Sequence, residues 1–203
     1  MWNTPNILTL ARIGLIPVLV VVFYWPAEWA AIASALVFAV AALTDLLDGY
    51  LARKLGQTSA LGAFLDPVAD KLMVAIALVL LVQAEPTPAL AIAAAIIIGR
   101  EITVSAVREW MAEIGERAKV AVSLIGKFKT TAQMVAITLL LLRDSIGGVP
   151  THSIGMVLLY IAAALTLWSM LVYLRAAWPI LSAPGEPPTG RRAEDGAASP
   201  DEA

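Results

Sequence analysis

Long apolar stretches, separated by short breaks of polar residues, proline and glycine, run through almost the whole chain. We predict that they form six membrane-spanning helices within the 203 residues, because a helix needs about 20 mainly apolar residues to cross a bilayer. The breaks contain residues that end helices, such as Pro26, Pro86 and Pro150. The predicted spans cover residues 8–24, 29–53, 61–83, 88 to beyond 108, 120–142 and 154–175.

The composition supports an all-α polytopic membrane protein. Hydrophobic residues make up 60 % of the chain and charged residues 15 %, whereas a soluble domain averages about half apolar and a quarter charged residues. The chain has no cysteine and one histidine, His152, which excludes disulfides, thiolate metal sites and histidine clusters. A bound metal would need oxygen ligands, which Mg²⁺, Mn²⁺ and Ca²⁺ prefer.

Basic residues are distributed unevenly between the two sides of the predicted membrane domain. On one side of the predicted domain, Arg143 is the only lysine or arginine in the connections between spans. Most others lie near the N-terminus, the second and fourth connections and the tail: Arg12, Arg53, Lys54, Arg108, Arg117, Lys119, Lys127, Lys129, Arg175, Arg191 and Arg192. An excess of Lys and Arg marks cytoplasmic ends, so we expect both termini in the cytoplasm. We assign residues 1–181 to a membrane domain and residues 182–203, rich in Pro, Gly, Ala and charge, to a disordered cytoplasmic tail.

Four aspartates lie where predicted helices approach the cytoplasmic face, and acids inside spanning helices mark functional sites. Asp45 and Asp48 are three residues apart, and Asp66 and Asp70 are four apart, so each pair shares a helix face. No lysine or arginine stands inside either pair, and facing carboxylates repel each other. We therefore expect a pair of divalent cations, rather than a protein cation, among these aspartates. The alternative is that Asp45 and Asp48 are helix-end residues in interfacial water.

The segment around these aspartates resembles a family signature. It reads Asp45-x-x-Asp48-Gly49-x-x-Ala52-Arg53-x8-Gly62-x-x-x-Asp66-x-x-x-Asp70. This pattern is similar to the signature of the CDP-alcohol phosphatidyltransferase family at all eight fixed positions, and the likeness extends over residues 3–175. The resemblance implies a six-helix membrane fold, usually dimeric, with two divalent cations (Mg²⁺ or Mn²⁺) on the cytosolic side.

The resemblance also implies a role for each residue of the signature. The expected metal ligands are Asp45, Asp48, Asp66 and Asp70. Asp70 is also the expected general base. The positions that match contacts to the CDP part of CDP-diacylglycerol are Gly49, Ala52, Arg53, Ser59 and Gly62. Asn6 and Thr9 are expected to face the nucleotide as well, with helix capping as the alternative.

Basic residues of the fourth and fifth predicted spans stand outside the signature. They are Arg100, Arg108, Lys127 and Lys129. The flanking stretches are similar to family members whose acceptor is sn-glycerol 3-phosphate, so we expect these cations to bind the phosphate of that acceptor. Alternatively, Arg108 pairs with Glu109 or Glu113, and the two lysines reach lipid phosphates. Glu101 is a further partner for a neighbouring arginine.

Other functions stay open at this point. Inositol phosphate is the closest competing acceptor because it also carries a phosphate, and serine and phosphatidylglycerol are others. A cation transporter also uses intramembrane acids, but it should place them near the bilayer midplane. The resemblance implies a multi-pass homodimer in the bacterial cytoplasmic membrane, with its site facing the cytoplasm, membrane lipids around it and no nucleic-acid partner.

Overall fold

The computed structural model describes residues 4–55, 60–113, 124–143 and 148–181. Every element assigned in this part of the chain is a helix, which confirms the all-α prediction, and each predicted span overlaps one helix. The predicted tail and Ser59 lie outside the described residues. The helices are α1 (Thr4–Phe23), α2 (Ala30–Leu55), α3 (Ala60–Ala84), α4 (Pro88–Glu113), α5 (Leu124–Leu141) and α6 (Thr151–Leu181).

Several helices are long and apolar enough to cross a membrane. Within the described residues, three stretches meet this requirement, and they are Asn6–Phe23, Pro88–Ala112 and Thr151–Arg175. Among the described residues, the apolar stretches found in α2 and α5 are shorter, at Ala30–Asp45 and Phe128–Leu141. The described structure thus supports a membrane protein, while six spans and cytoplasmic termini stay predictions.

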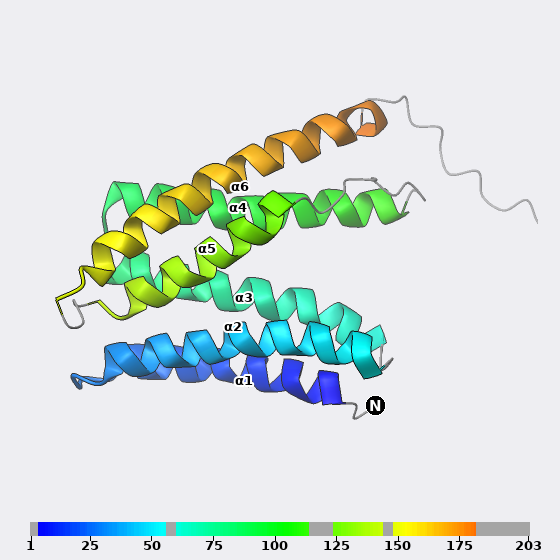
Figure 1. Ribbon diagram of the computed structural model, residues 1–203. Helices are drawn as coiled ribbons and strands as arrows, with labels where there is room; N and C mark the ends of the chain where they lie inside the picture. The colour runs from blue at the N-terminus through cyan, green and yellow to red at the C-terminus, as the bar shows by residue number, and fades with distance from the viewer. Residues whose placement is uncertain (1–3, 56–59, 114–123, 144–147, 182–203) are drawn as a thin grey trace, which may run out of the picture.

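The helices alternate in direction. The start of α1 and the end of α6 consequently lie at the same end of the molecule (Figure 1). α1 packs against α2 and α3, whereas α6 packs against α5 and α4. Contacts of α2 with α5 and of α3 with α4 join these two groups. The site described below lies where the two groups meet.

This alternation separates the bundle into an apolar half and a charged half. Each helix contributes a fully buried hydrophobic side chain to the core: Leu19, Phe38, Leu78, Ile97, Ile137 and Leu159. Along α1, α3 and α5 the charged residues precede this core residue, whereas along α2, α4 and α6 they follow it. Because neighbouring helices run in opposite directions, both orders place the charges at the end where α1 begins.

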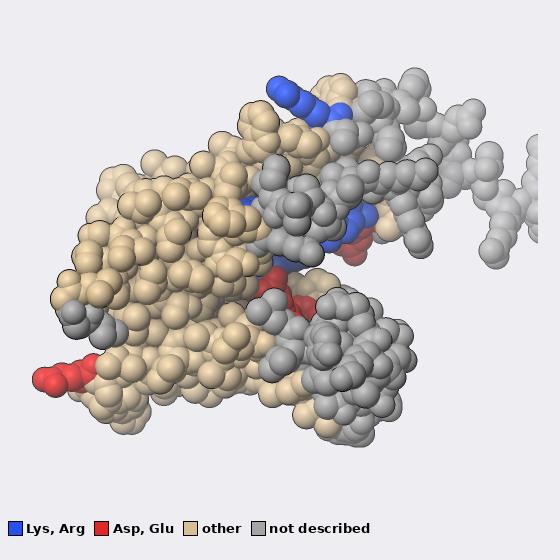
Figure 2. All heavy atoms as spheres, in the orientation of Figure 1, with Lys and Arg blue, Asp and Glu red and all other residues tan. Residues whose placement is uncertain are grey.

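The outer surface is strongly apolar. Side chains such as Leu36, Val79 and Ile92 are more than half exposed, at 59 %, 59 % and 62 %. In the view of Figure 2, the left part of the surface is almost free of charged residues, apart from one acidic side chain at its lower edge. A soluble monomer rarely exposes a continuous apolar area of this size, so lipid chains are the expected neighbours of this surface.

Polar contacts connect neighbouring helix ends in the apolar half of the bundle. His152 Nε2 lies 2.6 Å from Glu85 Oε2, which joins the start of α6 to the end of α3. Arg143, just after α5, donates from Nη2 to the carbonyl oxygen of Phe23 at 3.4 Å. Its guanidinium carbon also lies 4.2 Å from the centroid of the Phe23 ring, a cation–π arrangement.

Candidate active site

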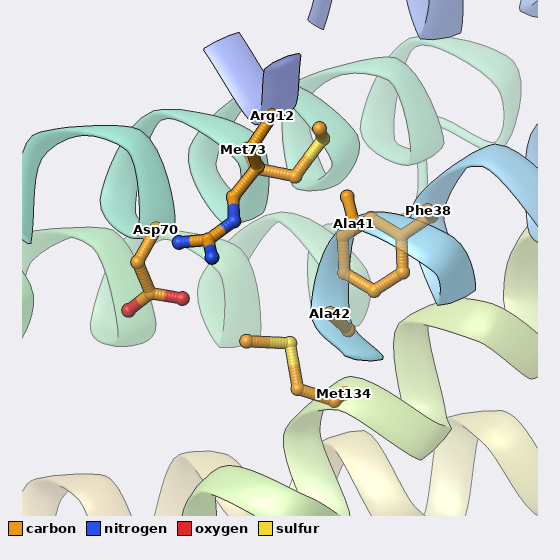
Figure 3. Close-up of a pocket in the computed structure, with 7 residues that line it drawn as sticks. All are labelled: Arg12, Phe38, Ala41, Ala42, Asp70, Met73 and Met134. Atoms are coloured by element: carbon orange, nitrogen blue, oxygen red, sulfur yellow. The ribbon is translucent and has the colours of Figure 1, made fainter. Parts of the chain in front are cut away.

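Charged side chains of both signs meet in a hollow between the two groups of helices (Figure 2). A small pocket at this level is bounded by α1, α2, α3 and α5. Its lining residues are Arg12, Phe38, Ala41, Ala42, Asp70, Met73 and Met134 (Figure 3). The Arg12 guanidinium and the Asp70 carboxyl point into the pocket, and the other lining side chains are apolar. The pocket therefore combines two opposite charges with apolar walls.

Arg12 reaches from α1 to the carboxylate of Asp45 on α2. The side chain is 1 % exposed, and its Nη1 donates to Asp45 Oδ1 at 2.7 Å. A guanidinium keeps its charge when buried and needs an anionic partner. The expectation that no protein cation serves these aspartates is therefore wrong for Asp45. Spacing within the two aspartate pairs gave no sign of Arg12, because it comes from a different helix.

A second side chain of α1 binds Asp66 on α3. Thr9 is fully buried, and its hydroxyl donates a hydrogen bond to Asp66 Oδ1. Thr9 lies in the second turn of α1, so helix capping does not explain it. Asn6, one turn earlier, is also buried, at 4 % exposure. The polar face of α1 is thus turned toward the carboxylates of α2 and α3.

Asp70 has a different environment from Asp45 and Asp66. It lines the pocket, and the charges of Asp45, Arg12 and Lys71 act on its carboxyl group. A carboxylate that faces a cavity can meet a ligand without first breaking a hydrogen bond to α1. Among Asp45, Asp66 and Asp70, the carboxyl group of Asp70 is the one that lines this pocket.

The aspartates fit a divalent-cation site by their donor chemistry. Carboxylate oxygens are the ligands that Mg²⁺ and Mn²⁺ prefer, and Asp70 presents one such group to the pocket. Among the described residues, no three carboxylate or imidazole side chains converge on one point. Arg12 and Thr9 instead engage Asp45 and Asp66. Asp48 lies on α2, but its side chain is outside the described set.

The expected nucleotide contacts can be placed only in part. Gly62 is buried near the start of α3. Gly49, Ala52 and Arg53 follow Asp45 on α2, and their side-chain surroundings lie outside the described residues. α2 therefore carries these positions at the polar end of the bundle, as the sequence predicts.

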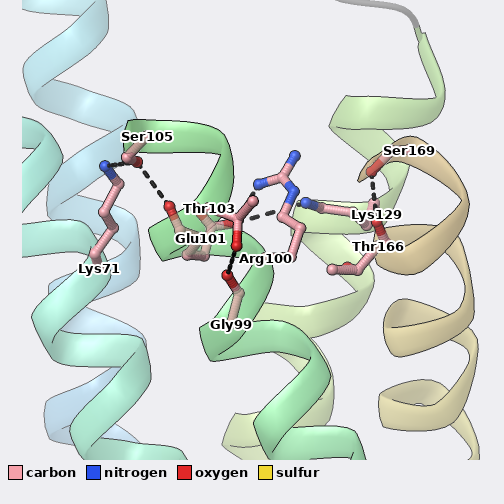
Figure 4. A network of polar contacts seen from close by, with 9 residues as sticks. All are labelled: Lys71, Gly99, Arg100, Glu101, Thr103, Ser105, Lys129, Thr166 and Ser169. Carbon is pink, nitrogen blue, oxygen red and sulfur yellow. Dashed lines mark hydrogen bonds and ion pairs between the residues drawn. The ribbon is translucent and has the colours of Figure 1, made fainter. Parts of the chain in front are cut away.

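A second charged cluster lies between α4 and α5 (Figure 4). Arg100 Nη1 donates to Glu101 Oε1 in an ion pair, and Lys129 Nζ lies 3.7 Å from the same oxygen. The side chain of Lys129 is 4 % exposed and that of Arg100 is 19 % exposed. This geometry confirms that Glu101 pairs with a neighbouring arginine, and it adds a lysine from another helix.

The two clusters adjoin each other. Lys71 on α3 donates to the Ser105 hydroxyl on α4, and that hydroxyl donates to the carbonyl oxygen of Glu101 at 2.7 Å (Figure 4). The charge of Glu101 also acts on Asp70, and the charge of Asp70 acts on Lys129. Carboxylates of α2 and α3 thus face cations of α4 and α5 across one site.

The structure does not bring all the expected acceptor-binding residues together. Arg108 is exposed on α4, and it forms no ion pair with Glu109 or any other described residue. Lys127 lies on α5 with its side chain outside the described set. The site therefore contains Arg100 and Lys129, whereas Arg108 lies about two turns farther along α4.

Sequence reasoning did not assign Lys71 to the site, and it did not pair Arg12 with Asp45 or Glu101 with Lys129. Each is a charged residue inside a predicted span, which is itself a signal of function. Their depths along alternating helices place them in the same layer as Asp45 and Asp70. Depth along the helices therefore indicates that such residues share a layer, but it does not identify their partners.

Comparisons with known proteins give a consistent result. The family model of CDP-alcohol phosphatidyltransferase matches residues 2–168. The CDP-diacylglycerol–glycerol-3-phosphate 3-phosphatidyltransferase of Salmonella choleraesuis is 56 % identical over 176 residues, which cover 87 % of this chain and 95 % of that relative. Proteins of the same name from Shigella flexneri serotype 5b and Escherichia coli K12 are each 54 % identical with the same coverage. Together with the site geometry, these matches establish that the chain belongs to the CDP-alcohol phosphatidyltransferase family.

Proposed function

We propose that this chain transfers the phosphatidyl group of CDP-diacylglycerol to sn-glycerol 3-phosphate, giving phosphatidylglycerophosphate and CMP. One observation carries the proposal: relatives that are 54–56 % identical over 87 % of the chain are named for this activity. The arrangement of charges supports it, because acids of α2 and α3 face cations of α4 and α5. Such a site can accept a metal-bound pyrophosphate and a separate phosphate monoester together.

The transfer exchanges one phosphorus–oxygen bond for another. The 1-hydroxyl oxygen of glycerol 3-phosphate bonds to the lipid-side phosphorus, while the bond from that phosphorus to the bridging oxygen breaks. CMP leaves with the electron pair of the broken bond, and Asp70 accepts the hydroxyl proton as general base. Its position in the pocket supports this role.

The remaining acids and the signature residues bind the donor. Asp45, Asp48, Asp66 and Asp70 would hold two divalent cations, Mg²⁺ or Mn²⁺, whose chemistry there is neutralisation of phosphate charge. Arg12 balances part of the negative charge at Asp45. The residues proposed to contact the CDP part are Asn6, Thr9, Gly49, Ala52, Arg53, Ser59 and Gly62.

The basic residues of α4 and α5 bind the acceptor. Arg100 and Lys129 provide a guanidinium and an ammonium group that end beside one carboxylate, and such groups suit a phosphate monoester. Lys127 and Arg108 are proposed to contribute from positions nearer the cytoplasm. Serine as acceptor would not require this much basic charge.

The proposed reaction also fixes the expected setting of the protein. We infer six spans, both termini in the cytoplasm, and a homodimer in the bacterial cytoplasmic membrane with the site facing inward. The distribution of basic residues supports this orientation. Alternating helix directions, which bring all helix charges to one end, support it as well (Figure 1).

The reaction type can be tested with purified protein in detergent. CDP-diacylglycerol is supplied with Mg²⁺ or Mn²⁺, and CMP release is followed with and without glycerol 3-phosphate. We expect CMP release to require both the acceptor and the cation, and to stop when a chelator is added. Release of CMP that does not depend on any acceptor would contradict a transferase.

A further inference from the structure

Glu101 is an acid in the middle of the proposed acceptor site, where an anion should oppose the binding of a phosphate. Its carboxylate takes part in ion pairs with Arg100 and Lys129 through the same oxygen, Oε1. These partners come from α4 and α5, two helices whose backbones do not pack against each other in the described structure. Side chains therefore connect α4 to α5 here, and Arg100 and Lys129 both contact the carboxylate of Glu101 (Figure 4).

The main chain of Glu101 is held as well. The Ser105 hydroxyl donates to its carbonyl oxygen at 2.7 Å, and Lys71 of α3 donates to that hydroxyl. Lys71 of α3 thus reaches Glu101 indirectly, through Ser105. The main chain at Glu101 is in this way linked to α3, while its carboxylate contacts Lys129 of α5.

The two cations need such a partner. Their positive charges act on each other, and the Lys129 side chain is 4 % exposed, so water cannot screen the repulsion fully. Without an anion between them, the two groups would separate. Arg100 Nε is also buried without a hydrogen-bond partner among the described residues, which leaves a donor available to an incoming acceptor.

We propose that Glu101 is a positioning residue of the acceptor site, which holds Arg100 and Lys129 side by side so that both engage the phosphate of the acceptor. This inference rests on the proposed function. It assigns Glu101 an effect on acceptor binding and none on the binding of CDP-diacylglycerol. The phosphate meets a pair of cations that is already assembled, which lowers the cost of ordering two long side chains.

Steady-state kinetics of Glu101→Gln in the full-length protein tests the proposal. The amide keeps the size of the side chain but removes its charge. We expect KM for glycerol 3-phosphate to rise about tenfold or more, with KM for CDP-diacylglycerol and kcat each within about threefold of wild type. An unchanged or lowered KM for glycerol 3-phosphate, or an equal rise for both substrates, would overturn the proposal.

A double-mutant cycle separates positioning from a general structural role. In a Lys129→Met background, Glu101→Gln should raise KM for glycerol 3-phosphate by less than about threefold, because the partner that it positions is already gone. If the fold-changes in KM of the two single variants multiply in the double variant, Glu101 does not act through Lys129. Glu101→Asp, which keeps the charge, should recover part of the acceptor affinity, and no recovery would count against the proposal.

Two comparisons complete the design. Glu109→Gln is the matched control, because Glu109 is exposed on the same helix and should leave both KM values unchanged. The rise in melting temperature of each folded variant when glycerol 3-phosphate is added measures binding of the acceptor without turnover. If wild-type protein uses inositol phosphate and not glycerol 3-phosphate, the proposed function fails. If wild type uses glycerol 3-phosphate and Glu101→Gln binds it equally well, only the role of Glu101 fails.

Discussion

Asp45, Asp66 and Asp70 differ in their contacts with side chains of α1. Arg12 and Thr9 bind Asp45 and Asp66, whereas Asp70 faces the pocket. A proton acceptor must reach the reacting hydroxyl, so access to the pocket favours Asp70 among the three. Asp45 and Asp66 are held in place, as ligands for a cation should be. We therefore propose two roles for the same residue type, according to its neighbours.

Removal of the proton acceptor should abolish turnover without unfolding the protein. Asp70→Asn keeps the shape of the side chain, but an amide cannot accept the hydroxyl proton. We expect CMP release to fall by about a thousandfold, while the melting temperature in detergent stays close to that of wild type. Turnover within about tenfold of wild type would remove Asp70 as the base.

Loss of either buried cation should affect one substrate more than the other. Arg100→Ala and Lys129→Ala each remove a charged donor from the site between α4 and α5. We expect KM for glycerol 3-phosphate to rise about tenfold to a hundredfold, with a much smaller change for CDP-diacylglycerol. Arg108→Ala should have a smaller effect because its side chain is exposed. Equal changes for both substrates would argue against a separate acceptor pocket.

The sequence predicts the acids of the site better than it predicts their partners. The pairs Asp45–Asp48 and Asp66–Asp70 follow from spacing on a helix, since residues three or four apart share a face. Arg12 is 33 positions away from Asp45 in the chain, and only the packing of α1 against α2 brings the two together. Local pattern has no information about that contact, so the sequence does not identify Arg12 as a counter-charge of Asp45.

At the scale of elements, the length of the apolar runs predicts where the helices lie in the chain. It does not predict how they pack. The six predicted spans each correspond to a helix, because long apolar runs leave few other folds. The sequence does not predict which helices touch, since every span is apolar on most of its surface. At Gly155, for example, α6 approaches Leu140 and Ala136 of α5 closely.

A methyl group at Gly155 should weaken the contact between α5 and α6. A Cβ atom there would lie 2.9 Å from Leu140 Cγ and 3.2 Å from the carbonyl oxygen of Ala136. We expect Gly155→Ala to destabilise the fold by about 1–3 kcal/mol, seen as a lower melting temperature in detergent. Gly14→Ala is the control, because nothing lies within 4 Å of a Cβ at that position. Equal melting temperatures for the two variants would show that the packing is looser than described.

At the scale of the whole molecule, the charged half is the end of the bundle where we propose that the reaction takes place. A soluble acceptor with a phosphate cannot cross the apolar half, so the site must open where the substrate is made. The distribution of Lys and Arg predicts that this side is cytoplasmic. The start of α1 and the end of α6 lie at the same end (Figure 1).

Cysteine labelling can test this orientation, because the chain has no cysteine of its own. Glu28 lies between α1 and α2, and Glu109 lies toward the opposite end of the bundle, and both are exposed. In spheroplasts, a membrane-impermeant maleimide should label Glu28→Cys and spare Glu109→Cys. After lysis both variants should react. The reverse pattern in spheroplasts would place the site outside the cell.

The identity of the lipid product tests the central claim most directly. Purified protein is given CDP-diacylglycerol with equal concentrations of glycerol 3-phosphate and inositol phosphate, and the lipids are identified by mass. We predict phosphatidylglycerophosphate as the main product, formed in equal amount with CMP and absent for Asp70→Asn. A main product that carries inositol phosphate, or CMP without a new lipid, would contradict the account.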